Sequence, residues 1–259
     1  MDISRSLVAF ALLFPAIAAC SSTPDEEAAP DQGAEALANG RATGTHPEVG
    51  RVELKAVGLV DAPPTHCVGT LVAPTVVLTT RSCAFGSLVS DGGTFFVDSD
   101  TDHDGKIDQT HRFAIKYGAA LRQLGSKYGT LYFAKLAAAV PTSLATAAPM
   151  RRAKLADMEK VFAIGYGREG TEGWGAKNWV SFPFHYATGL AKDDATPHVL
   201  NDEQGDLGSA ALDVRGQLVA VAVSAGSTNW FFEHPDNWEE LSDHFDRIDT
   251  FVKELSAQK

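Results

Sequence analysis

Residues 98–108 hold five aspartates within eleven positions, a density that could bind a cation. Asp100, Asp102 and Asp104 alternate along the chain, and Gly105 follows them. A step of two residues turns successive carboxylates toward one centre, and the glycine permits a sharp bend, as in a calcium loop. The calcium loop that this pattern predicts consists of Asp100, Asp102, Asp104, Lys106 and Asp108.

The calcium pattern is incomplete. His111 stands where a bidentate glutamate normally completes such a loop, and an imidazole is a poor calcium ligand. Residues 95–97 and 112–117 on either side have the composition of strands, which argues against a helix–loop–helix unit. The alternative is a solvated acidic hairpin tip, whose carboxylates repel one another unless solvent or a cation screens them.

A glycine turn followed by small apolar residues marks a second stretch of interest, residues 205–212, with the sequence GDLGSAAL. It resembles the Gly-Asp-Ser-Gly turn of the trypsin-like (chymotrypsin-fold) serine proteases. In that family the backbone of the turn binds the oxyanion and its serine attacks the substrate carbonyl. Here Gly205 and Asp206 are kept, but Leu207 stands at the nucleophile position and cannot form an acyl-enzyme.

The block of residues 66–83 is similar to the same family, in which a catalytic histidine directly precedes the second of two cysteines. Cys67 and Cys83 have the family's spacing of sixteen residues, and Ser82 takes the histidine position. A neutral hydroxyl cannot serve as a general base near pH 7. If Cys20 carries a lipid, Cys67 and Cys83 are an even pair, which favours a disulfide in an oxidising compartment over two buried thiols.

The third landmark is the run of residues 130–136, which resembles the family's Asp-Ile-Ala-Leu-Leu-x-Leu. Thr130 occupies the position of the aspartate that orients the catalytic histidine, and a hydroxyl cannot stabilise an imidazolium as a buried carboxylate does. All three triad positions, Ser82, Thr130 and Leu207, are therefore substituted. The resemblance implies a protease fold without protease chemistry.

The elements that would hold these residues are mainly strands. From Pro47 onward the chain consists of short apolar runs split by Gly, Pro and Asp, which is typical of an all-β protein. The family resemblance implies two antiparallel six-stranded β-barrels packed together. We expect the trypsin-like domain at residues 46–259, with the first barrel at about 46–140, the second at about 141–240 and a C-terminal helix at 241–255.

The first nineteen residues predict a signal peptide, with Arg5 before an apolar run that is too short to span a bilayer. The small residues before Cys20 resemble a bacterial lipobox, which implies a lipidated Cys20; a plain secretory signal is the alternative. Ser21 resembles lipoproteins of the Gram-negative outer membrane. Residues 20–45 hold almost no large apolar residue and predict a flexible tether. We expect a lipid-anchored envelope protein, or a periplasmic or secreted one.

Three functions follow from these patterns. The favoured one is a non-catalytic protease homologue (pseudoprotease) that binds a protein or peptide, acts as a monomer and needs no cofactor, with calcium as the one candidate ion. The second is an active trypsin-like endopeptidase or other hydrolase with displaced groups, for which Ser209, His66, His185 and His198 are candidates by residue type. The third is a calcium-stabilised structural module of the envelope. A net charge of −11 argues against nucleic acid as a partner.

Lipidation of Cys20 can be tested by fractionation. The substitution Cys20→Ala should move the protein from the membrane fraction to the soluble fraction, because no other anchor is expected. Incorporation of a labelled fatty acid into the wild type, and its loss in the variant, is the direct measurement. A variant that stays in the membrane fraction, or a wild type without label, would contradict the lipobox interpretation.

Overall fold

The computed structural model describes residues 41–56, 65–84, 89–102, 106–121, 131–169, 173–174, 177–183, 206–224 and 237–258. All of them belong to one compact unit, Gly33–Lys259. The expected signal peptide and Cys20 lie outside the described residues. So do Asp104, Thr130 and Gly205, and the candidate bases His185 and His198.

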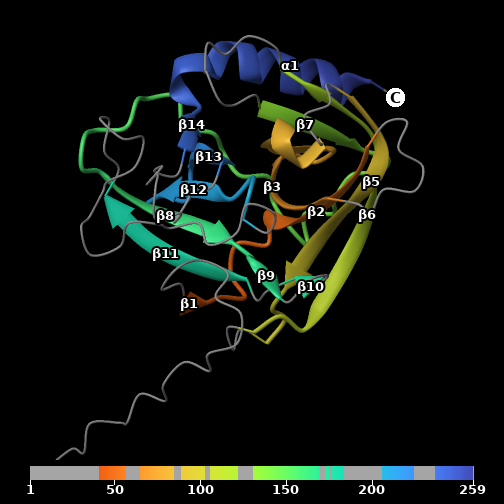
Figure 1. Ribbon diagram of the computed structural model, residues 1–259, viewed down its shortest axis with the longest axis horizontal. Coiled ribbons are helices and arrows are strands. Elements are labelled where there is room, and N and C mark those ends of the chain that lie inside the picture. Colours follow the sequence, from red (N-terminus) through yellow and green to blue (C-terminus); the bar gives the residue numbers. More distant parts are fainter. Residues whose placement is uncertain are drawn as a thin grey trace, which may run out of the picture. The chain divides into compact units, whose positions relative to one another are not determined.

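A closed six-stranded antiparallel barrel forms the first part of the fold (Figure 1). Its strand order is β2-β3-β4-β7-β6-β5. The alternation of large apolar side chains fills the interior with residues such as Val52, Leu71, Phe95 and Tyr132. The strands are β2 (Val49–Ala56), β3 (Thr65–Ala73), β4 (Val76–Thr80), β5 (Val89–Ser99), β6 (Gln109–Ala120) and β7 (Leu131–Leu136). The expectation of a first barrel is confirmed.

The second part is a six-stranded sheet with the order β1-β11-β8-β12-β13-β14, which does not close on itself among the described strands. A separate two-stranded sheet pairs β9 with β10. The second closed barrel therefore stays a prediction. These strands are β1 (Arg41–Ala42), β8 (Lys160–Gly165), β9 (Arg168–Glu169), β10 (Gly173–Trp174), β11 (Asn178–Pro183), β12 (Ala210–Asp213), β13 (Leu218–Ser224) and β14 (Asn237–Glu240).

Two short segments extend this framework at the ends of the described chain. Strand β1 pairs with β11, so Arg41 and Ala42, which we assigned to the tether, form an edge of the second sheet. At the other end, the 3₁₀ turn η2 (Ser242–His244) leads into helix α1 (Phe245–Ala257). The helix buries Ile248, Val252 and Leu255 in a core cluster that it shares with both sheets.

Helix α1 lies against the first barrel, across β3, β4 and β7 (Figure 1). Lys135 of β7 fixes its C-terminal end, since the Lys135 Nζ donates to the Ser256 carbonyl at 3.2 Å and to the Thr75 hydroxyl at 2.9 Å. A cation at this end of a helix interacts favourably with the exposed carbonyl groups. Burial, and the nearby charge of Lys116, lower the pKa of Lys135.

A buried polar network joins the barrel to the second sheet. Arg51 of β2 donates two hydrogen bonds to Asp98 of β5, at 2.8 and 3.1 Å, and Thr110 donates a third at 2.6 Å. Lys177, before β11, is buried and donates to the carbonyl of His46. Burial lowers the pKa of Lys177 to about 8, although Glu48 and Asp98 oppose the shift. The network fixes the end of β5 and the segment before β2.

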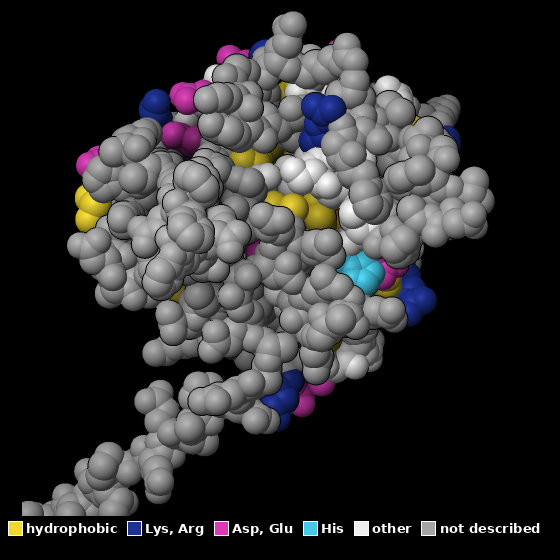
Figure 2. Space-filling view, viewed as in Figure 1, with side chains coloured by type: hydrophobic (Ala, Val, Ile, Leu, Met, Phe, Trp, Pro, Cys, Tyr) yellow, Lys and Arg dark blue, Asp and Glu magenta, His cyan; other side chains and the backbone are white. Residues whose placement is uncertain are grey.

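The described side chains on the face shown in Figure 2 are mixed in charge. Among the side chains coloured in Figure 2, those of Lys and Arg and those of Asp and Glu are scattered, with no extended patch of one sign. None of the described helices is long and apolar enough to cross a bilayer.

Candidate functional site

The disulfide Cys67–Cys83 is present, and it ties β3 to η1 (Arg81–Ala84), the 3₁₀ turn that follows β4. Cys83 is buried, whereas Ser82 beside it is exposed. The Ser82 hydroxyl donates to the carbonyl of Val223 in β13 at 3.4 Å. The turn that carries Ser82 therefore lies against the second sheet.

Residues 206–209 form a turn that lies between β3 and β13 and is hydrogen-bonded to both. The Val68 amide donates to the Leu207 carbonyl at 2.8 Å, and the Gly208 amide donates to the Ala222 carbonyl at 2.9 Å. Gly208 has φ +85°, and a Cβ atom there would lie 2.0 Å from the Val68 carbonyl oxygen. Both the left-handed conformation and the close approach of β3 require glycine at this position.

Ser82 and Leu207, two of the positions that the family resemblance singled out, lie on segments that contact each other. The Cys83 Sγ lies 3.8 Å from the Leu207 carbonyl oxygen, and Ser82 and Gly208 contact the adjacent β13 residues Val223 and Ala222. Sequence reasoning placed these positions in one site from widely separated motifs, and the fold brings them together. Thr130, the third position, lies outside the described residues.

Leu207 does not present its side chain as a nucleophile would be presented. It is half-buried and packs against the barrel cluster that contains Cys67, Cys83 and Leu71. Ser209, considered above as a displaced nucleophile, is fully buried, and its hydroxyl has no hydrogen-bond partner among the described residues. A substrate cannot reach a hydroxyl in that position without local unfolding.

The carboxylate of Asp206 is fully buried. In the family that this turn resembles, the aspartate pairs with a freed N-terminus. Here the Asp206 Oδ1 accepts a hydrogen bond from the Gly167 amide at 2.9 Å. Hydrogen bonds to a carboxylate offset part of the free energy of its burial.

His66, a candidate general base by residue type, lies on β3 directly across from Glu53 of β2. The His66 Nε2 is 3.9 Å from the Glu53 Oε1, and both side chains are partly exposed. The register thus pairs His66 with a carboxylate on the barrel surface.

The acidic loop between β5 and β6 brings three of the predicted calcium ligands together. One carboxylate oxygen from each of Asp100, Asp102 and Asp108 lies within 4.8 Å of the others. Asp108 also holds the loop, because it accepts hydrogen bonds from the Thr101 hydroxyl at 2.6 Å and the Thr101 amide at 2.7 Å. These hydrogen bonds lower the pKa of Asp108. Lys106, another residue of the predicted calcium loop, precedes Asp108 in the chain, and its side chain is exposed.

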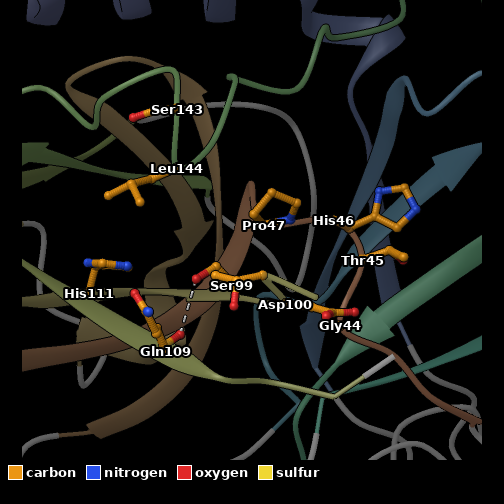
Figure 3. Close-up of a pocket in the computed structure, with 11 residues that line it drawn as sticks. Gly44, Thr45, His46, Pro47, Ser99, Asp100, Gln109, His111, Ser143 and Leu144 are labelled. Carbon is orange, nitrogen blue, oxygen red and sulfur yellow. Dashed lines mark hydrogen bonds between the residues drawn. The ribbon is translucent and has the colours of Figure 1, made fainter. Parts of the chain in front are cut away.

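A cavity of about 520 Å³ lies beside the acidic loop (Figure 3). Four separate segments line it: residues 44–47, residues 99–101 at the end of β5, Gln109 and His111 of β6, and Ser143 with Leu144 from the connection after the barrel. The Ser99 hydroxyl donates to the Gln109 carbonyl at 3.5 Å across the base of the hairpin. The His111 Nε2 is buried and has no hydrogen-bond partner among the described residues.

A smaller cavity of about 240 Å³ shares Thr45 and His46 with the first one. Its walls are mostly apolar and come from Phe162, Trp179 and Leu212 of the second sheet. Sequence reasoning did not find either cavity, because no motif connects segments that are so far apart. Two of the lining residues had attracted attention for another reason: Asp100 as a predicted calcium ligand, and His111 as the residue that replaces one.

Comparison with protein-family models gives no match for this sequence, and comparison with curated proteins gives none either. The all-β fold with one closed six-stranded barrel is compatible with a trypsin-like barrel.

Calcium binding at the acidic loop should raise the melting temperature of the protein. An extracellular-type site with Kd near 10⁻⁴–10⁻³ M would gain roughly 1 kcal/mol from millimolar calcium, or about 2–4 °C for a domain of this size. The substitution Asp102→Asn should abolish the rise, whereas Glu254→Gln, an exposed change on α1, should keep it. If the wild type melts at the same temperature in EDTA and in calcium, the loop does not bind calcium and is a solvated turn.

Proposed function

We propose that this protein is a non-catalytic homologue of trypsin-like serine proteases, a pseudoprotease that acts as a protein- or peptide-binding module. The observation that carries the proposal is the position of Leu207. Its backbone lies in a glycine turn of the family's kind, while its side chain packs into the barrel cluster. A residue without a lone pair or an ionisable proton cannot attack a carbonyl.

The surroundings of Leu207 support the same proposal. The Ser82 hydroxyl donates a hydrogen bond to a backbone carbonyl, and serine has no basic nitrogen that could accept a proton. The disulfide and the turn lie together as the proposal requires, because the Val68 amide donates a hydrogen bond to the Leu207 carbonyl directly beside Cys67. A framework that is kept while its reactive groups are replaced is suited to binding.

We further propose that the domain works at the bacterial cell envelope, anchored by a lipid on Cys20, as a monomer. The disulfide supports this, because such bonds persist in oxidising compartments. A second candidate function, a calcium-stabilised structural module, is favoured by the convergence of Asp100, Asp102 and Asp108.

The absence of serine-hydrolase chemistry can be tested with a fluorophosphonate probe and generic peptide and ester substrates. The wild type should show no covalent labelling and no turnover. Leu207→Ser should remain inert, because a single restored hydroxyl lacks a base and an orienting carboxylate. Labelling of the wild type that disappears on substitution of one serine would establish an active hydrolase instead.

A further inference from the structure

Among the residues that the structure describes, the larger cavity shares none with the site around Ser82 and Leu207. It is lined by residues 44–47 and 99–101, by Gln109 and His111, and by Ser143 and Leu144. The turn of residues 206–209 and η1 contribute nothing to it. A volume of about 520 Å³ falls in the range of pockets that bind small molecules or single side chains. The cavity is therefore a candidate binding site, separate from the positions that the family resemblance singles out.

The walls of this cavity are fixed by contacts on each side. Asp98, directly before the lining residues of β5, is held by the hydrogen bonds of Arg51 and Thr110. Residues 44–47 are held by Lys177, which donates to the His46 carbonyl. A cavity with walls fixed in this way is largely preformed, which lowers the entropy cost of binding.

The charge of the cavity is negative on the side of the acidic loop. Asp100 lies in the wall, packed so closely against Gly44 that a Cβ atom on that glycine would fall 2.5 Å from the Asp100 Oδ2. Asp102 and Asp108 place two further carboxylates near it. None of the lining residues that the structure describes is a Lys or an Arg.

The remaining walls are suited to the aliphatic part of a long side chain. Pro47 and Leu144 supply apolar surface, and Figure 3 shows both among the side chains around the cavity, with Asp100 beside Gly44. Lys and Arg side chains combine an apolar stem with a cationic head, and a planar guanidinium can form two hydrogen bonds to one carboxylate.

We propose that this cavity binds the arginine or lysine side chain of a peptide, with the cationic head at Asp100 and the stem against Pro47 and Leu144. The inference rests on the proposed binding function and names the ligand class for it. The ligand would thus be recognised by a basic side chain beside the barrel, and not by the former catalytic site.

The test uses amide chemical shifts of the isotope-labelled protein in EDTA, so that calcium cannot compete. The probes are Nα-acetyl-arginine amide and its neutral isostere Nα-acetyl-citrulline amide. The arginine probe should shift the amide signals of Thr45, Thr101 and Ser143 at millimolar concentration. The citrulline probe should bind at least about tenfold more weakly, because it lacks the charge.

Two variants and one control complete the experiment. Asp100→Asn should weaken binding of the arginine probe about tenfold, and Glu254→Gln on α1 should leave it unchanged. Ser143→Trp, at an exposed position on the rim, should block the probe by volume while the dispersion of the amide spectrum shows a folded domain. Equal binding of the two probes, or shifts that persist in Asp100→Asn, would overturn the proposal. So would shifts confined to the acidic loop.

The cavity proposal and the pseudoprotease proposal can be contradicted independently of each other. If the arginine probe does not bind and the fluorophosphonate probe does not label, the cavity proposal is wrong and the pseudoprotease proposal stands. If the fluorophosphonate probe labels a serine while arginine binds at Asp100, the pseudoprotease proposal is wrong and the cavity still binds a basic side chain.

Discussion

The contact between the glycine turn of residues 206–209 and strand β3 is the constraint on which the other parts of the site depend. Val68 donates to the Leu207 carbonyl, Thr79 donates to the Val68 carbonyl at 2.6 Å, and Gly208 leaves no room for a side chain between them. This contact joins the barrel to the second sheet. It also places the disulfide beside the turn, so that Ser82 and Leu207 come together.

The same contact explains why the glycine turn is needed by the fold whatever side chain stands at position 207. A turn at the junction of two sheets is needed for packing whether or not it carries a reactive group. Burial of an apolar side chain such as that of Leu207 contributes on the order of 1–2 kcal/mol, whereas a serine there would leave a polar group to be satisfied. Packing at the junction is therefore a sufficient reason for a leucine at this position.

The features that sequence could predict are those that depend on local spacing. The pairing of Cys67 with Cys83, the strands of the first barrel and the apolar face of helix α1 follow from positions that are close in the chain. The cavity beside Asp100 could not be predicted, because Pro47, His111 and Leu144 meet only through the closure of the barrel and the path of the chain after it. The pairing of Arg41 with Trp179 was missed because a strand of two residues is too short to show an alternating pattern of apolar and polar side chains.

The central claim, that Leu207 is a packing residue at the junction of the barrel and the second sheet, is tested most directly by the melting temperature of Leu207→Ser. Loss of the buried side chain should cost about 1–3 kcal/mol and lower the melting temperature by several degrees. Val214→Ser, the same kind of change at a position that is 68% exposed, should have almost no effect. A Leu207→Ser protein that melts at or above the wild-type temperature would contradict the account.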